Sequence, residues 1–444
     1  MQLVAYGAQD IYLTGNPQIT FFKVVYRRHT NFAVESIEQT FNGQADFGKR
    51  VTATISRNGD LIQQMYLEVL LPKTGVATDT WTYGVGNALV KQAEIEIGGQ
   101  LIDRQYGDWM NIWTELTTPE GKRKGYDNMV GNLAKSATQL GNLSSNSANQ
   151  RLYIPLQFWF NRNPGLALPL IALQYHEVKL NLELRPSADL LQQAQAITAG
   201  QLLTCKLYVD YIYLDTDERR RFAQVSHEYL IEQVQFTGSE SIGARASSKN
   251  VTLNFNHPVK ELIWAHLSST NNAGRRWFNY SGSSTDSADS FESALLQLNG
   301  HDRFSLRQAD YFRKVQNYEH HTRVPRVGSD VAGANNKITV TGLTSDVDGL
   351  TAEQNADVVI QYFGEFDDSR RQYIYSYSFA LSPEEHQPSG TCNFSRIDNA
   401  VLQLKYDFAT QTAINTGTMS LNIYAVNYNV LRIMSGMGGL AYSN

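Results

Sequence analysis

The sequence carries the same succession of strand-like and turn-like segments twice, about half a chain apart. Five short matches occur in one order: Ile95–Gly99 with Leu296–Gly300, Asp108–Met110 with Asp310–Phe312, Tyr153 with Tyr373, Leu180–Leu184 with Leu402–Tyr406, and Val209–Leu214 with Val426–Leu431. The separations of 201 to 222 residues far exceed the roughly 20–50 residues of a solenoid repeat. We therefore predict a duplicated domain with different loops in its two copies.

The segment 151–184 indicates which kind of structure is repeated. It begins with an apolar, aromatic run from Leu152 to Phe160, in which Pro155 marks an edge strand or a bulge. From Val178 to Leu184 apolar and polar residues alternate strictly, as in a strand with one buried face. The chain between these strands is too apolar for an exposed loop, so we expect it to cross a core.

Length and composition agree with two β-rich units. The 444 residues amount to about twice a large all-β domain, and aromatic residues make up 11% of the chain. Many short strands, long polar loops and few helices predict an all-β fold, with a β-sandwich or a jelly roll in each half. The clearest helix is expected at 109–116, where Trp109, Ile112, Trp113 and Leu116 recur at helical spacing.

We divide the chain into an N-terminal arm (1–24), a first domain (25–214), a charged linker (215–225) and a second domain (226–444). The arm is expected to pack on a neighbour or beneath its own domain. Strand character begins at Phe21, and the Asn58-Gly59 turn between two strand-like runs predicts a β-hairpin. The Gly-rich C-terminus contains Met and Leu, so we expect it to be tucked in.

Three polar insertions, at 131–150, 268–290 and 326–357, are predicted to be surface loops. The last contains Asp346 and Asp348, which resemble the start of a calcium loop. The segment lacks the third acidic position and the bidentate Glu that such a loop needs. We therefore expect no calcium site there.

Motifs that would carry catalysis or bind a cofactor are missing. The Gly-rich turn at Gly84 lacks the pattern of a phosphate-binding loop, and no nucleophile-elbow or Cys-His signature occurs. The adjacent His320 and His321 are expected to point to opposite faces of a strand, which disfavours a shared metal ion. A Ser-His-Asp triad built from distant positions would escape such a search. On these grounds we expect a non-enzyme without cofactor or metal.

Charge and cysteine content restrict partners and compartment. The net charge of −5 lacks the cationic surplus that a nucleic-acid coat needs, and Arg219–Arg221 have acidic neighbours. We therefore expect no direct nucleic-acid binding. Two isolated cysteines, Cys205 and Cys392, are expected to be reduced. No signal peptide is visible and no apolar run is long enough for a membrane span, so the expectation is a soluble protein made in a reducing compartment.

Several long runs resemble one family closely: Gln2–Ile37, Ser56–Ile62, Pro164–Leu180, His227–Glu240, Phe255–Trp264, Gln387–Ala400 and Asn427–Tyr442. The family is that of the major capsid proteins of large icosahedral DNA viruses of algae, of the phycodnavirus and chlorovirus type. The resemblance implies two tandem eight-stranded jelly rolls and three copies per pseudo-hexagonal capsomer. It also implies a shell over an internal membrane around a large double-stranded DNA genome, assembled in the host cytoplasm with minor capsid and penton proteins.

The same resemblance implies N-glycans outside the ordinary sequon pathway. Asn415, in Asn415-Thr416-Gly417-Thr418, resembles such a site, although Ile414 stands where Ala or Gly is usual. Asn279, in the Ser-rich insertion, is the second candidate by location. Two other readings stay open from sequence: a carbohydrate-binding jelly-roll protein, which the aromatic content suits, and a minor capsid protein of the same fold.

Overall fold

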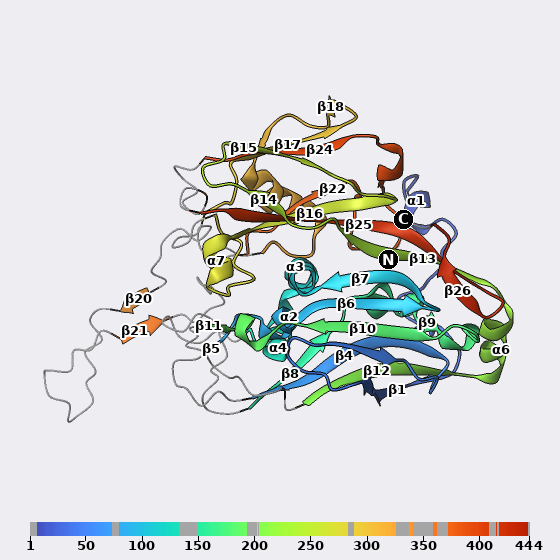
Figure 1. Ribbon diagram of the computed structural model, residues 1–444. Helices are drawn as coiled ribbons and strands as arrows, with labels where there is room; N and C mark the ends of the chain where they lie inside the picture. The colour runs from blue at the N-terminus through green and yellow to red at the C-terminus, as the bar shows by residue number, and fades with distance from the viewer. Residues whose placement is uncertain are drawn as a thin grey trace, which may run out of the picture.

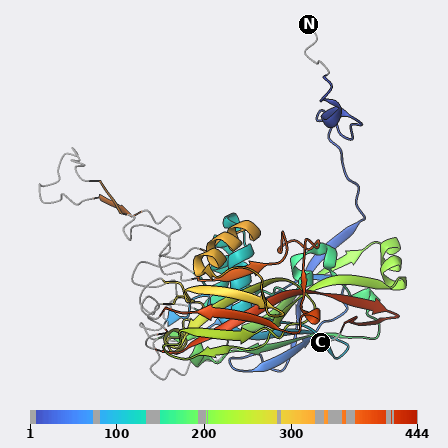
Figure 2. The same ribbon diagram turned by 90° about the horizontal axis from the view of Figure 1, so that it is seen from above.

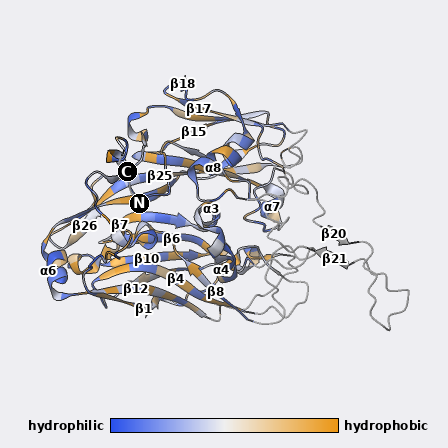
Figure 3. Ribbon diagram, turned by 180° about the vertical axis from the view of Figure 1, so that it is seen from behind, coloured by the Kyte–Doolittle hydropathy of each residue, from blue (hydrophilic) through white to orange (hydrophobic). Residues whose placement is uncertain are grey.

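A computed structural model describes residues 7–72, 80–132, 149–192, 202, 204–282, 288–325, 337–340, 358–361, 372–407, 414 and 417–442. Four principal antiparallel sheets lie in two sandwiches, one from each half of the chain, which sit side by side (Figure 1). Hydrophobic residues recur along the strands, whereas the connecting helix α6 is largely hydrophilic (Figure 3). The fold is mostly β, as the sequence predicted.

The first sandwich uses strands between residues 32 and 214. One sheet has the order β1-β12-β4-β8, with β9 on β4, and the other has the order β2-β3-β10-β6-β7. Strands β5 and β11 form a small separate pair. The bounds are β1 Phe32–Gln39, β2 Phe41–Asn42, β3 Arg50–Thr54, β4 Leu61–Leu71, β5 Thr80–Trp81, β6 Val90–Ile97, β7 Gln100–Tyr106, β8 Gln150–Pro155, β9 Leu168–Pro169, β10 Val178–Leu184, β11 Leu191–Gln192 and β12 Thr204–Leu214.

The second sandwich repeats the arrangement. One sheet has the order β13-β25-β16-β22, with β14 and β26 on β25 and β23 on β16, and the other has the order β15-β24-β17-β18, with β19 on β17. Strands β20 and β21 pair with each other. The bounds are β13 His227–Phe236, β14 Glu240–Ile242, β15 Ser248–Thr252, β16 Pro258–Ser268, β17 Ser293–Leu298, β18 His301–Asp302, β19 Arg307–Gln308, β20 Lys337–Val340, β21 Val358–Gln361, β22 Tyr375–Ser378, β23 Cys392–Asn393, β24 Ala400–Lys405, β25 Met419–Met434 and β26 Met437–Leu440.

Short helices join the strands. The α-helices are α1 Ile11–Thr14, α2 Val85–Leu89, α3 Gly107–Thr117, α4 Glu120–Val130, α5 Trp159–Arg162, α6 Thr216–Gln224, α7 Ser269–Ala273 and α8 Gln316–His320. A π-helical turn, η4 Tyr311–Val315, runs directly into α8, and 3-10 turns lie at η1 Pro164–Leu166, η2 Leu170–Ala172, η3 Ser187–Asp189 and η6 Phe394–Arg396. Helix α3 confirms the helix expected at 109–116.

The connectivity is that of a jelly roll in both halves. The eight main strands of the first half are, in chain order, β1, β3, β4, β6, β7, β8, β10 and β12; those of the second are β13, β15, β16, β17, β18, β22, β24 and β25. Counted this way, each half has one sheet of order 1-8-3-6 and one of order 2-7-4-5. This identity confirms the predicted duplication. The match of Val209 with Val426 lies in equivalent strands, but it is one residue out of register: Val209 points into its own core, whereas Val426 is in the row of side chains that faces the other half.

Two local predictions were wrong. No hairpin forms at Asn58-Gly59, because β3 and β4 belong to different sheets and the turn carries the chain from one to the other. Glycine is needed in this turn because a Cβ at position 59 would lie 2.8 Å from Cβ of Tyr211. The strand expected from Phe21 also does not form; residues 24–31 are extended and exposed, and the first strand begins at Phe32.

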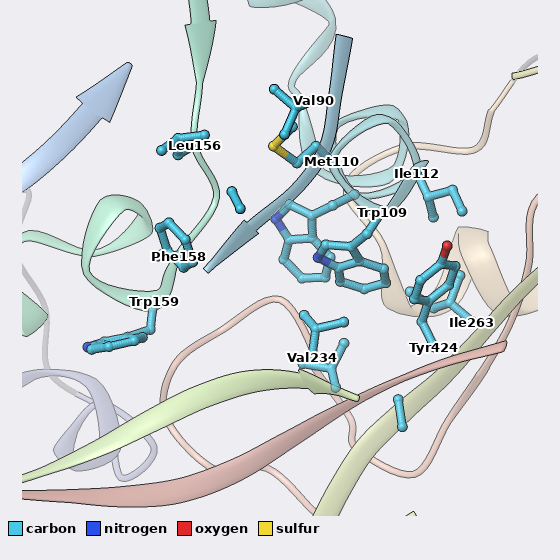
Figure 4. Packing of buried hydrophobic residues seen from close by; sticks show 14 of the residues in the cluster. Val90, Trp109, Met110, Ile112, Leu156, Phe158, Trp159, Val234, Ile263 and Tyr424 are labelled. Atoms are coloured by element: carbon cyan, nitrogen blue, oxygen red, sulfur yellow. The ribbon is translucent and has the colours of Figure 1, made fainter. Parts of the chain in front are cut away.

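Three further expectations hold. The alternating run is β10, in which every second residue is buried. Pro155 ends β8, an edge strand. The connection from Leu166 to Leu173 crosses the core, where most of its side chains are buried. Helix α3 lies against the second half, with Trp109 and Ile112 near Val234, Ile263 and Tyr424, whereas Met110 lies beside Val90 of the first half (Figure 4).

Candidate assembly surfaces

The two sandwiches meet through aromatic side chains. Tyr106, the last residue of β7, packs against Phe236 with ring centroids 5.0 Å apart, and Phe236 stacks on Tyr424 at 4.9 Å. Trp109, two residues into α3, lies 5.3 Å from Tyr424. The end of β7 and the start of α3 in the first half therefore cover the β13 and β25 side of the second half.

The edge of strand β13 is also closed by the first half. The backbone N–H of Val234 donates to Asp103 Oδ1 at 3.2 Å, and the Gln233 amide donates to the carbonyl oxygen of Ile102. Burial raises the pKa of Asp103 to about 6, although hydrogen bonds from Gln105 and Val234 oppose this effect. An edge strand that would otherwise expose backbone groups is thus capped within the chain.

A buried ion cluster links the halves beside this edge. Glu232 of β13 lies 2.8 Å from Lys260 Nζ and 3.3 Å from Arg162 Nη1, and only Arg162 comes from the first half. Burial alone would raise the pKa of Glu232, but Arg162, His386 and Lys260 outweigh it and lower the pKa to about 2. Lys260 also donates to the carbonyl oxygen of Glu385 at 2.9 Å, so no charge in the cluster is isolated.

The C-terminus and one insertion bind the halves at two further places. Strand β26 returns onto β25, and His176 of the first half contacts the Gly438 backbone through Nδ1 at 2.9 Å. This confirms that the C-terminus is tucked in. In the insertion after β16, Trp277 Nε1 donates to the Asp189 carbonyl oxygen at 2.8 Å, and Arg185 lies over the Trp277 ring at 3.9 Å.

Strand β1 is the counterpart of β13, and no described segment of the chain covers it in this way. Seven of its eight residues are exposed or half-buried, and Phe32 and Val34 are more than half exposed. Beside it, the outer face of the sheet carries a pair of stacked tyrosines, Tyr66 and Tyr208, with centroids 5.3 Å apart. Exposed apolar and aromatic surface on an edge strand is typical of an interaction site.

The opposite end of the stack, in the second half, is open too. Helix α8 and the preceding turn η4 occupy the position that α3 has in the first half. Their outer side exposes Val315 at 40% and Tyr318 at 80%, and Leu306 close by at 46%. Among the described residues, each half therefore has an uncovered surface, and the two surfaces are of different kinds.

The N-terminal segment adds a third surface. Residues 7–31 extend away from the sandwiches (Figure 2). Nine large apolar side chains in this segment are at least 65% exposed: Ile11, Tyr12, Leu13, Ile19, Phe21, Phe22, Val24, Val25 and Tyr26. The described part of the arm does not pack beneath its own domain, and it is far more apolar than a solvated tail.

Of the two predicted glycosylation sites, the structure describes one. Asn279 lies half-buried after α7, where its side-chain oxygen accepts from the Ser281 backbone N–H at 3.2 Å. Ser281, the hydroxyl residue of its sequon, is fully buried. Asn415 is outside the described residues, as are Asp346 and Asp348 of the calcium-like sequence. Both asparagines stay predictions.

Other titratable groups form ion pairs that stabilise the fold. His321 was expected in a strand but ends helix α8, where Nε2 lies 3.0 Å from Glu261 and Nδ1 lies 3.0 Å from Glu384. Burial alone would lower the pKa of His321, but the two carboxylates raise it to about 9. Arg219 of the basic cluster pairs with Asp60 at 2.9 Å. Across the described ranges, no group of three or more His, Cys, Asp or Glu could hold a metal ion, and no helix could span a membrane.

Comparison with known protein families decides what this architecture is for. The family described as "Major capsid protein N-terminus" matches residues 20–215, and "Large eukaryotic DNA virus major capsid protein" matches 218–331 and 360–439. The chain belongs to the major capsid proteins of large eukaryotic DNA viruses. It is a structural protein of the icosahedral viral capsid shell and not an enzyme.

Individual relatives cover the whole chain. The major capsid protein of Pyramimonas orientalis virus is 54% identical over all of this chain and 99% of its own length. That of Paramecium bursaria Chlorella virus 1 is 44% identical with the same coverage. The structure of PBCV-1 VP54, fitted into a reconstruction of the virophage Sputnik, is 40% identical, with a TM-score of 0.74 over 96% of this chain and all of that one. The sugar-binding alternative finds no support in these matches.

The sequence analysis did not identify the residues that join the two halves or those that form the uncovered surfaces. Glu232 follows the apolar pair Leu230-Ile231, and Lys260 follows Val259 in a strand that continues with Leu262 and Ile263; a charge in such a place is a usable signal of a buried partner. Arg162 gave no such signal, because nothing local indicates that it reaches the other half. The exposed Val315 and Tyr318 could have been found from the duplication, since they fall 202 residues after the buried Trp113 and Leu116.

Proposed function

We propose that three copies of the chain join head to tail into a pseudo-hexagonal capsomer, the building block of the shell. The observation that carries this proposal is the contrast between β13 and β1. They are the first strands of equivalent jelly rolls. Strand β13 is covered by the end of β7 and the start of α3, whereas β1 is exposed. The exposed outer side of η4 and α8 in the second half is the surface that would cover β1 of a neighbouring copy.

Closure follows from the geometry of such contacts. A contact between two different surfaces is heterologous, so repeating it produces a ring when the rotation closes. If the contact between copies resembles the contact within a chain, the ring consists of jelly rolls joined by one kind of contact. Three chains with two jelly rolls each then supply six. In this proposal 25–214 and 226–444 are the two units, 215–225 is the linker and 1–24 is the arm. Six similar units suit a hexagonal lattice of neighbouring capsomers.

The two ends of the subunit suggest its orientation in the shell. The arm leaves β1 at Phe32, which pairs with Leu214 just before α6. Helix α7 and the β20–β21 hairpin lie at the other end (Figure 1). We place the insertion end (131–150, 268–290, 326–357) outward and the arm end inward, toward minor capsid proteins, penton proteins and an inner membrane. Proteolysis or antibody mapping of intact virions would overturn this placement if the insertions proved inaccessible.

Further parts of the proposal concern glycans, genome and assembly site. Asn279 and Asn415 are the candidates for N-glycans; an intact mass of virion-derived protein that equals the polypeptide mass would exclude both. The subunit is proposed to enclose a large double-stranded DNA genome without contacting it, and to assemble in the host cytoplasm. The net charge of −5 and the Arg219–Asp60 pair support the absence of direct nucleic-acid contact.

Light scattering of the purified native protein, with negative-stain images of the same fraction, tests the capsomer. The expected mass is three times the 49.9 kDa of the chain, with any glycans added, and the particles should have hexagonal outlines. A stable monomer across micromolar concentrations, with no hexagonal outlines, would contradict the proposal.

A further inference from the structure

The outer faces of the two equivalent sheets correspond residue by residue. In the first half, one row across the strands contains Glu38, Tyr208, Tyr66 and Pro155, and in the second half it contains Phe236, Tyr424, Ile263 and Ser376. Two observations fix this alignment. Tyr66 and Ile263 are each the sixth residue of an eleven-residue strand, and each strand pairs with the last strand of its jelly roll across a register shift.

The second-half row is the one that the first half covers. Tyr106 and Trp109 pack on Phe236 and Tyr424 of that row, in which Tyr424 and Ile263 are buried and Phe236 is half-buried. In the first half no described residue covers the equivalent row in this way. Tyr208 and Tyr66, the equivalents of Tyr424 and Ile263, are only half-buried; they stack on each other, and Tyr66 also meets the ring of Tyr153 edge-on in the same sheet.

The covering element has a counterpart as well. Strand β7 ends at Tyr106 and is followed by α3; strand β19 ends at Gln308 and is followed by η4 and α8. With this spacing of 202 residues, Trp109 corresponds to Tyr311, Trp113 to Val315 and Leu116 to Tyr318. The first-half residues are buried, with at most 4% exposed, whereas Val315 and Tyr318 face solvent.

We infer that η4 and α8 of one copy pack on the Tyr208–Tyr66 row of the next copy, with Tyr311 on Tyr208 as Trp109 lies on Tyr424. This inference rests on the proposed head-to-tail capsomer and names its contacts. Aromatic pairs of this kind contribute beyond the area that they bury. Val315 of η4 and Tyr318 of α8 extend the contact, and Phe32 and Val34 of β1 supply further apolar surface for it.

The substitutions between the two rows are chemically consistent with this contact. Where the covered row has Phe236 under Tyr106, the open row has Glu38, and the counterpart of Tyr106 is Gln308. An apolar pair is thus replaced by a polar pair, because a Gln amide can donate to a carboxylate. Glu38 already pairs with Lys206 at 2.9 Å, and Arg307, whose guanidinium lies over the Tyr311 ring at 4.3 Å, would add a second positive charge at this rim. The interface between copies is therefore more polar at its rim than the interface within the chain, as suits a surface that stays soluble before assembly.

Site-directed cross-linking tests the inference. The variant Tyr311→Cys/Tyr208→Cys, treated with a short bismaleimide, should give covalent dimers and trimers on a denaturing gel and nothing larger. Background should be low, because burial raises the pKa of the Cys205 thiol to about 12 and also raises that of Cys392, so both react slowly as nucleophiles. Each single variant and the pair Tyr311→Cys/Glu177→Cys, which places the second thiol just before β10 of the other sheet, should remain monomeric on the gel.

The outcomes separate this inference from the capsomer proposal. A native trimer that fails to cross-link through Tyr311 and Tyr208 overturns the inference and leaves the capsomer standing, whereas a wild-type monomer overturns the capsomer itself. If the double variant does not assemble, Tyr318→Asp decides. It should raise the concentration of half-dissociation at least about tenfold. Tyr442→Asp, equally a change of an exposed tyrosine, should leave it unchanged; equal effects of the two would overturn the inference.

Discussion

Replacing Glu232 by Gln removes the central negative charge of the ion cluster between the halves while keeping the shape of the side chain. The carboxylate is almost fully buried and faces both Lys260 and Arg162. Its pKa is lowered from 4.5 to about 2, so it stabilises the folded chain above pH 4.5 and loses that effect as the pH falls through 2. The shift corresponds to about 3 kcal/mol at pH 7.

A second argument gives a similar magnitude. Removing one partner of a buried ion pair leaves the other charges uncompensated, at a cost of about 3–5 kcal/mol. We therefore expect Glu232→Gln to lower the free energy of unfolding by about 3 kcal/mol at pH 7. By linkage the difference should shrink to about 1 kcal/mol at pH 3.

Urea denaturation followed by tryptophan fluorescence measures both values. The matched control is Glu228→Gln, four residues earlier on β13, where the pair with Arg432 is at 2.8 Å but both side chains are more than half exposed. Such a pair contributes about 0–1 kcal/mol. Equal losses in the two variants, or a Glu232→Gln deficit that does not shrink on acidification, would refute the account of the cluster.

Other perturbations have defined signs. His321 has a pKa raised to about 9, so its pairs with Glu261 and Glu384 stabilise the fold below pH 6.5, and this stabilisation is lost as the pH rises through 9. The melting temperature of the wild type should therefore approach that of His321→Gln between pH 7 and 9.5. A constant difference between the two, or the same behaviour of the exposed His301→Gln variant, would contradict this. Gly107→Ala should destabilise by about 1–3 kcal/mol, because its Cβ would lie 2.2 Å from the carbonyl oxygens of Asn87 and Val90 at the start of α3. Gly125→Ala, in the middle of α4 with nothing within 4 Å of the new Cβ, should instead stabilise by up to about 1 kcal/mol; thermal unfolding of both variants checks the opposite signs.

Local periodicity predicted the elements that are buried on one face. The alternation in 178–184 and the helical spacing in 109–116 report directly which side chains enter the core, and both appear in the structure as β10 and α3. The duplication predicted that the two halves share one fold, and their strand orders are identical. It could do so because equivalent jelly rolls bury equivalent rows of residues.

Contacts between distant segments could not be predicted in this way. Asn58-Gly59 marks a turn in any sheet arrangement, and only the sandwich decides that the flanking strands separate. The run from Phe21 to Tyr26 has strand composition, but a strand needs a partner, and the described chain supplies none for these residues. Arg162 and Glu232 are 70 residues apart, so no local pattern relates them.

The central claim is that one kind of contact, seen once within the chain, is repeated between copies. A cryo-EM reconstruction of the purified oligomer tests it most directly, because it shows which element lies on β1. The account predicts a three-copy ring in which η4 and α8 of each copy cover β1 and the Tyr208–Tyr66 row of the next. A reconstruction in which β1 faces β1 of another copy, or in which this row faces solvent in a closed trimer, would contradict it.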